Sequence, residues 1–230
     1  METEKESSHR KGVVTISKGA LAELPACEFP GKIFIVDSLD KLPRAIEILK
    51  SSPLIGFDTE TRPSFKKGQQ YKVSLVQLST PEVCFLFRIN QIGFPVELKQ
   101  ILEDDSILKI GVSIHDDFHN LAKITEFTPQ SFIDLQSYVK DFRIIDNSLA
   151  RIYAILFNQR ISKGQRLTNW EAESLSEAQQ AYAALDAYAC IKIYNHLKEG
   201  KFNPQTSPYL TFPEVTLSET NPSVENPSEG

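Results

Sequence analysis

Short apolar runs, bounded by polar or turn-forming residues, mark the strands that the sequence predicts. Runs of this length without helical spacing are typical of strands buried in a sheet. Most of them lie in the first half of the chain, where few long helical patterns separate them. We expect strands at residues 33–36, 54–59, 72–78, 83–87, 107–111 and 132–133.

Apolar residues recur at helical spacing between and after these strands. The longest such segment follows Ser176, and Gln179 stands three residues later, which is the pattern of a capping box. Successive strands, followed by strands that alternate with helices, predict an α/β fold with a mixed central β-sheet and helices on both faces. We expect helices at residues 39–49, 95–103, 118–123, 135–139, 148–156 and 177–198.

The composition changes at both ends of the chain. The start, METEKESSHRK, is polar and carries acids, so it predicts neither a signal peptide nor a membrane span. From Asn203 onward the chain has five prolines and no lysine or arginine, which is typical of a disordered tail. We therefore expect a polar extension over residues 1–30, one domain over 31–202 and a disordered tail over 203–230. Three residues of this tail are candidates for docking back onto the domain: Tyr209, Leu210 and Phe212.

Charge and cysteine content narrow the class of protein. The net charge is −5, and four of the acids lie beyond Phe202, so the remainder of the chain is nearly neutral. The three cysteines are widely spaced and odd in number, which favours reduced thiols and a cytoplasmic protein over a disulfide framework. His115 and His119 lack the partners of a zinc motif, so zinc is disfavoured.

Two acids stand at the end of the strand expected at 54–59. Asp58 and Glu60 are two residues apart, so on a strand their side chains point to the same face. Both can therefore bind one cation from the same side. A solvated strand end, where acids are common, explains them equally well when this segment is taken alone.

Two later segments carry further candidates for chemistry. In the turn His115-Asp116-Asp117, either aspartate can cap the helix that follows, and the sequence leaves open which of them could face a metal. Tyr182 and Asp186 are four residues apart in the last helix, which places a phenol beside a carboxylate on one face. Packing of Tyr182 in the core, with its hydroxyl bonded to Asp186, is the structural alternative.

Taken in this order, the three segments resemble the DEDD superfamily of 3′-to-5′ exonucleases. The similarity is to the tyrosine-bearing subclass, which holds ribonuclease D and the exonuclease domain of the Werner syndrome helicase. It covers residues 33–197 and includes the triplet at 58–60 and the tyrosine and aspartate of the last helix. It also includes the pattern G-V-x-I-x-x-D, and this pattern selects Asp117 over Asp116. The resemblance implies a ribonuclease H-like fold with the first two acids on its central strand.

The resemblance also implies a reaction. Such enzymes hydrolyse phosphodiester bonds from the 3′ end of a nucleic acid and release nucleoside monophosphates, using two divalent cations that activate water and stabilise the leaving oxygen. Asp58, Glu60 and Asp186 would hold the first ion, Asp58 would bridge to the second, and Asp117 would support it. Tyr182 would orient the attacking water. Mg²⁺ or Mn²⁺ suits a site made of carboxylates, because hard cations prefer oxygen ligands.

Basic and aromatic residues in two expected loops are candidates for contacts with a single-stranded 3′ end of DNA or RNA. They would form a positive rim around an acidic centre, although solvated loop charges are as good an explanation. Phe65 is a candidate either for stacking on a base or for anchoring the core. Trp170 is interpreted as a packing residue. The assignment to substrate binding covers Thr59, Phe65, Lys66, Lys67, Lys163 and Arg166.

Two other functions stay open. A relative without catalysis could keep this fold as a nucleic-acid-binding module, but such a protein would be expected to lose carboxylates. A two-metal hydrolase of small phosphoesters would share the metal chemistry, and it would need a closed pocket in place of an open groove.

Overall fold

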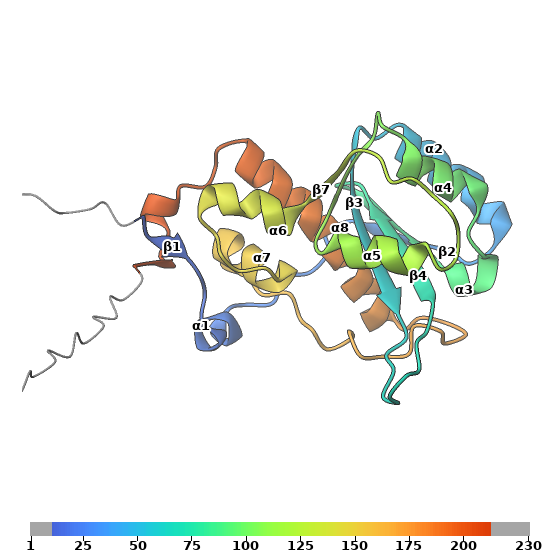
Figure 1. The fold of residues 1–230 in the computed structure, drawn as a ribbon, viewed down its shortest axis with the longest axis horizontal. Helices are drawn as coiled ribbons and strands as arrows, with labels where there is room; N and C mark the ends of the chain where they lie inside the picture. The colour runs from blue at the N-terminus through green and yellow to red at the C-terminus, as the bar shows by residue number, and fades with distance from the viewer. Residues whose placement is uncertain (1–10, 213–230) are drawn as a thin grey trace, which may run out of the picture.

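A mixed sheet of six strands forms the centre of the computed structural model, which describes residues 11–212. The strand order is β2-β5-β4-β3-β6-β7 (Figure 1). β3, β4 and β5 form an antiparallel meander, and β2, β6 and β7 each pair in parallel with a neighbour. The six strands that the sequence predicts are confirmed. Their bounds are β2 (Lys32–Val36), β3 (Leu54–Thr61), β4 (Val73–Ser79), β5 (Val83–Phe87), β6 (Leu108–Gly111) and β7 (Phe132–Asp134).

Helices cover both faces of the sheet, because alternate strand residues point to opposite sides. Phe57 and Val76 pack on one face against α2 (Leu42–Lys50), α4 (Val96–Glu103) and α5 (Ile114–Leu121). Leu75 and Leu86 pack on the other face against α8 (Glu177–Lys198), which crosses behind the sheet in Figure 1. The remaining helices are α1 (Lys18–Glu23), α3 (Ile89–Ile92), α6 (Leu135–Tyr138) and α7 (Leu149–Phe157), with 3-10 turns η1 (Leu39–Lys41), η2 (Val139–Phe142) and η3 (Pro204–Thr206).

Helix α8 approaches the sheet at Gly56 without a side chain between the two backbones. A Cβ atom added at Gly56 would lie 1.9 Å from the carbonyl oxygen of Ala187. The residues of α8 at this contact are small: Ala183, Ala184 and Ala187 are all fully buried. Glycine on the strand and alanine on the helix therefore allow α8 to pack closely on β3.

Both ends of the described chain join the packed body. β1 (Val13–Val14) pairs antiparallel with β8 (Leu210–Thr211), and Val14 and Ile16 are buried. Asp146 fixes the N-terminal segment, because its carboxylate accepts the backbone N–H of Ile16 at 3.0 Å. Packing thus extends beyond the expected domain limits of 31 and 202. The rest of the two expected tails, residues 1–10 and 213–230, lies outside the described residues.

Two further features of residues 11–212 bear on the class of protein. No helix in this part of the chain combines the length and apolar composition needed to cross a membrane. Cys84 and Cys190 are buried as free thiols and Cys27 is a partly buried free thiol, in agreement with the expected reduced state.

Replacing Gly56 by alanine should push α8 away from β3, because the new methyl group meets backbone that cannot rotate away. We expect the free energy of unfolding to fall by about 1–3 kcal/mol, as in other overpacked cores. Urea unfolding followed by circular dichroism measures this change. Gly19→Ala is the control, since the nearest atom to a Cβ there is 4.0 Å away. Equal stability of the two variants would contradict the close contact.

Candidate active site

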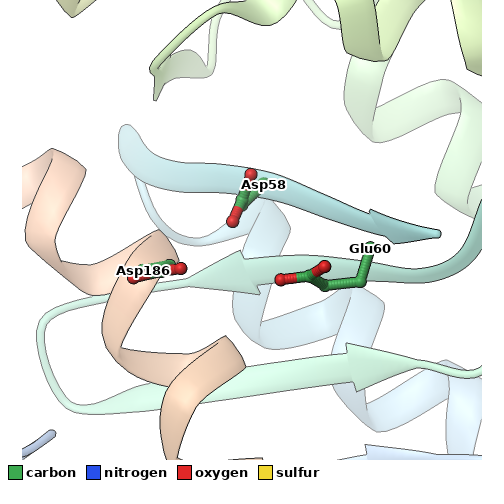
Figure 2. A group of neighbouring side chains, drawn as sticks. All are labelled: Asp58, Glu60 and Asp186. Carbon is green, nitrogen blue, oxygen red and sulfur yellow. The ribbon is translucent and has the colours of Figure 1, made fainter. Parts of the chain in front are cut away.

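Three carboxylates meet between β3 and α8 (Figure 2). Asp58 and Glu60 lie two residues apart on the same face of β3, as their spacing predicts. Both project toward α8, and Asp186 projects from α8 toward them. One carboxylate oxygen from each residue lies within 4.8 Å of the other two. Three oxygen ligands at this separation can hold a divalent cation.

Burial raises the pKa of all three acids, and neighbouring carboxylate charges raise the pKa of Asp58 and Glu60 further. Burial raises the pKa of Asp186 to about 7, although the phenol of Tyr182 and the ammonium of Lys163 oppose the change. The pKa of Glu60 rises to about 10, first through burial and then through the charges of Asp58 and Asp186. The pKa of Asp58 lies well above its ordinary value for the same two reasons. The group therefore holds protons until a cation replaces them.

Asp117 reaches the same region from α5. Thr59 lies between the two acids of β3, and its hydroxyl donates to a carboxylate oxygen of Asp117. The pKa of Asp117 rises to about 8, through burial and then through the negative charge of Asp58. Asp116 is exposed on the surface of the helix. Asp117 is therefore the aspartate of this pair that faces the acidic group, and the substrate-binding role of Thr59 stays a prediction.

The sequence predicted that this helix begins at residue 118, but α5 begins at Ile114. The earlier start is possible because a residue of β7 caps the helix. Asp134, at the end of β7, accepts the backbone N–H groups of Ser113 at 3.2 Å and of Ile114 at 3.3 Å. Gln136 donates its side-chain amide to the hydroxyl of Ser113 at 2.6 Å. Neither Asp116 nor Asp117 caps the helix, so the capping explanation for them is wrong. Asp134 is a site residue that the sequence analysis missed.

Tyr182 lies one turn of α8 before Asp186, and its ring packs beside the buried indole of Trp170, with centroids 6.2 Å apart. The position of Trp170 confirms its role in packing. Burial raises the pKa of the Tyr182 phenol above its ordinary value, and the negative charges of Asp186 and Glu60 raise it further. In the metal-free protein Tyr182 therefore keeps its proton at neutral pH, and its role in orienting water stays a prediction.

The loop before α8 brings positive charge to the acids. Lys163 and Arg166 are exposed, yet the charge of Lys163 lowers the pKa of Asp186 and the charge of Arg166 lowers that of Glu60. In the loop after β3, Lys66 and Lys67 are also exposed. Phe65 in the same loop is 83% exposed, so its interpretation as a core anchor is wrong. Cations from the loop before α8 thus border an acidic centre.

Comparison with known proteins identifies the family. Residues 33–200 match the model of a family described as 3′-5′ exonuclease. The chain belongs to the 3′-5′ exonuclease family. The members that match it are named as exonucleases, so this is a family of hydrolases that act on nucleic acids.

Two relatives show how the exonuclease chain compares with full-length proteins. It is 32% identical over 193 residues to the bifunctional 3′-5′ exonuclease/ATP-dependent helicase WRN of Mus musculus, a match that covers 79% of this chain and 14% of that protein. It is 30% identical over 205 residues to a 3′-5′ exonuclease of Arabidopsis thaliana, covering 80% of this chain and 69% of the relative. The chain therefore spans a small part of the first protein and most of the second.

Solved structures agree on the fold of the exonuclease chain. Ribonuclease D of Escherichia coli matches with a TM-score of 0.64 and 27% identity, over 73% of this chain and 44% of that one. The EXO domain of Aedes aegypti Nibbler matches with a TM-score of 0.65 and 23% identity, over 75% and 92% of the two chains. The ribonuclease H-like fold expected from the sequence is confirmed.

The raised carboxyl pKa values predict how stability of the metal-free protein depends on pH. Between the ordinary carboxyl pKa of about 4 and the value of about 8 for Asp117, the folded state holds protons that the unfolded state has released. The free energy of unfolding of the metal-free protein should therefore fall as the pH rises through this range. Added Mg²⁺ should restore more stability at the upper end than at the lower.

Thermal unfolding in EDTA and in Mg²⁺, recorded at several pH values, measures both effects. Glu60→Gln removes a titrating group and should flatten the pH dependence of the metal-free protein. Asp40→Asn is the control, because Asp40 is exposed on η1 and its charge does not shift the pKa of the four acids, so the dependence should stay unchanged. Identical pH profiles for Glu60→Gln and the unaltered protein would be incompatible with the prediction.

The cap of α5 gives a second prediction. Replacing Asp134 by alanine leaves the N–H groups of Ser113 and Ile114 without their acceptor and should lower the free energy of unfolding by about 1–2 kcal/mol. Because α5 carries Asp117, affinity for Mg²⁺ should also fall. Urea unfolding and calorimetric titration measure the two quantities. Asp134→Asn should recover part of both, whereas Asp141→Ala, at an exposed acid nearby, should change neither.

Proposed function

We propose that this chain is a two-metal-ion 3′-5′ exonuclease that hydrolyses phosphodiester bonds from the 3′ end of a single-stranded nucleic acid and releases nucleoside monophosphates. The observation that carries the proposal is the group of Asp58, Glu60 and Asp186, whose oxygens lie within 4.8 Å of one another. Asp117 lies beside this group, and Tyr182 lies on the same helix as Asp186. The tyrosine supports membership of the tyrosine-bearing subclass of the superfamily.

The donor set fits hard divalent cations. All four acids offer only oxygen ligands. Burial raises the pKa of each, and carboxylate charges raise the pKa of Asp58, Glu60 and Asp117 further, so a cation would relieve both effects. Asp58, Glu60 and Asp186 would hold one Mg²⁺ or Mn²⁺, and Asp58 with Asp117 would hold a second. When bound, the two ions lower the pKa of water and stabilise charge on the attacking and leaving oxygens.

The protein's own groups orient the reactants. The protonated phenol of Tyr182 is half-buried beside Asp186, where it positions the attacking water. Thr59 holds the carboxylate of Asp117 through its hydroxyl group. The positive charge of Lys163 lowers the pKa of Asp186, and that of Arg166 lowers the pKa of Glu60. Phosphates of an approaching strand would therefore meet cations at the edge of the site. Lys66 and Lys67 extend this positive edge along the strand.

The polymer can be DNA or RNA, and the free thiols of Cys27, Cys84 and Cys190 favour the cytoplasm as its location. Both statements are part of the proposal.

The reaction is tested with single-stranded DNA and RNA oligonucleotides labelled at the 5′ end, in Mg²⁺ or Mn²⁺. We expect a ladder that shortens from the 3′ end. Asp58→Ala should abolish it, because the remaining acids hold the cation poorly, and Tyr182→Phe should slow it by about 10²-fold, the scale of one positioning contact. Asp117→Ala should also lose activity.

Asp116→Ala is the matched control for Asp117→Ala, because the two residues are adjacent and only Asp117 faces the acids. Full activity of Asp117→Ala would contradict its place in the site. A protein that binds oligonucleotides without shortening them would be a nucleic-acid-binding module. A protein that cleaves only small diesters, without inhibition by added polymer, would be a phosphoesterase of another class.

A further inference from the structure

Gln77 on β4 is a buried polar side chain whose hydrogen-bonding capacity is unused. The residue is 0% exposed. Within residues 11–212, neither its amide nitrogen Nε2 nor its amide oxygen Oε1 has a hydrogen-bond partner. Burying an amide in this way costs free energy, because the bonds that it loses with water are not replaced. Buried polar groups are nearly always bonded in folded proteins, so an unpartnered one in the centre of a sheet requires an explanation.

The strand register places Gln77 directly opposite Asp58. β4 runs beside β3 in the opposite direction (Figure 2), and Asp58 is the residue of β3 that pairs with Gln77. Paired residues of neighbouring strands project from the same face, and their Cβ atoms are about 4.5–5.5 Å apart. Gln77 therefore lies on the face that carries the acids. A glutamine side chain is long enough to bring its amide to the carboxylate of Asp58 by rotation.

The other neighbours of Gln77 on this face are less suited to its nitrogen. Leu75, two residues earlier on β4, and Leu86, its partner on β5, are apolar. Ser79, two residues later, already donates its hydroxyl to the carbonyl of the next residue at 2.8 Å. Among these neighbours, all within the described chain, Asp58 alone carries a charged group. An ionised carboxylate only accepts hydrogen bonds, which matches the N–H groups of the amide.

A hydrogen bond from Gln77 would act on the ligand that the two cations share. In the proposed site Asp58 bridges the ions, so the direction of its carboxylate determines how both are held. Hydrogen bonds to a metal ligand commonly fix its orientation and strengthen binding. An amide is neutral, so it can support the carboxylate without competing with a cation for it. The burial of Gln77 also excludes water, which strengthens a bond to a charged acceptor.

Building on the proposed function, we propose that Gln77 is a positioning residue of the metal site, whose side-chain nitrogen donates to the carboxylate of Asp58 when the cations are bound. The bond fixes the bridging carboxylate. In the metal-free protein the amide stays unpaired, so cation binding gives it the partner that it lacks. Gln77 therefore makes the metal-free fold less stable and the binding of cations more favourable.

The test compares stability with metal affinity in Gln77→Met, which exchanges the amide for an apolar chain of similar length. The midpoint of thermal unfolding in EDTA should stay the same or rise, because an unpaired polar group is removed. Calorimetric titration should show that the affinity for Mg²⁺ falls by about tenfold, a typical effect of losing a hydrogen bond to a metal ligand. A defect in packing would lower the unfolding midpoint instead.

Ser79→Ala is the matched control, because Ser79 lies on the same face of β4 and is also buried, but pairs with Gly56 and not with an acid. Its hydroxyl is bonded, so the unfolding midpoint in EDTA should fall while the affinity for Mg²⁺ is unchanged. The Mg²⁺ concentration that gives half-maximal shortening of an oligonucleotide should rise about tenfold in Gln77→Met, in step with the affinity, and stay unchanged in Ser79→Ala.

Nuclear magnetic resonance of the unaltered protein tests the bond without a substitution. Addition of Mg²⁺ should shift the side-chain amide resonances of Gln77, assigned through bonds, because the nitrogen gains an acceptor. The side-chain amide of Gln179 is the internal reference. Its nitrogen already donates to the hydroxyl of Thr168 at 2.9 Å, so its resonances should not move.

Unchanged affinity of Gln77→Met for Mg²⁺ would overturn the proposal, as would a lower unfolding midpoint in EDTA or unmoved Gln77 resonances at saturating Mg²⁺. Shortening of oligonucleotides by the unaltered protein is measured separately. If shortening occurs but Gln77→Met binds Mg²⁺ normally, the positioning role fails while the exonuclease stands. If Gln77→Met binds Mg²⁺ weakly but the unaltered protein shortens no oligonucleotide, Gln77 supports a metal site and the proposed reaction fails.

Discussion

Close packing of α8 on β3 at Gly56 determines where the acids lie. Ala187 contacts the strand through its backbone, and Asp186 is the residue before it, so the carboxylate of α8 must lie next to that of Asp58. A larger residue at position 56 would separate the helix from the strand and the acids from one another. The alanines of α8 have the same effect, because they let the helix lie flat on the sheet. The geometry of the site therefore depends on small side chains that take no part in its chemistry.

The same packing brings like charges together, which opposes folding in the absence of a cation. Burial raises the pKa of Asp58, Glu60 and Asp186, and the charges of neighbouring carboxylates raise that of Asp58 and Glu60 further, so the metal-free protein keeps these groups partly protonated. Apolar packing on both faces of the sheet compensates for this unfavourable arrangement. Strained or repulsive arrangements persist where the surrounding structure holds them, and they commonly mark sites of function.

Much of the fold was predictable because its strongest signals are local. The central strands are continuous apolar runs, and the two-residue spacing of Asp58 and Glu60 fixes their common face whatever the tertiary structure. The choice of Asp117 over Asp116 came from a motif and agrees with the burial of the two side chains. The capping box of α8 is present as expected, with Ser176 and Gln179 each bonded to the other's backbone N–H group.

Other features depend on contacts between distant residues, which no local pattern records. The start of α5 depends on Asp134, which lies 20 residues after Ile114 and reaches it only because β7 pairs with β6. The pairing of β1 with β8 joins strands of two residues from opposite ends of the chain, too short for an apolar pattern to predict. The exposure of Phe65 was equally inaccessible, because an aromatic residue in a loop can fold inward or outward. These features require the three-dimensional arrangement of the sheet.

The pairing of Val13 with Thr211 has a topological consequence. It brings the two ends of the described chain side by side, on the part of the molecule opposite the loops that flank the acids (Figure 1). A short peptide could therefore connect residues 11 and 212 without crossing the sheet or the acidic site. The described chain is therefore close to a circular arrangement, with its two ends at the β1–β8 pair. A covalent link at this pair would contribute little to the arrangement of the carboxylates.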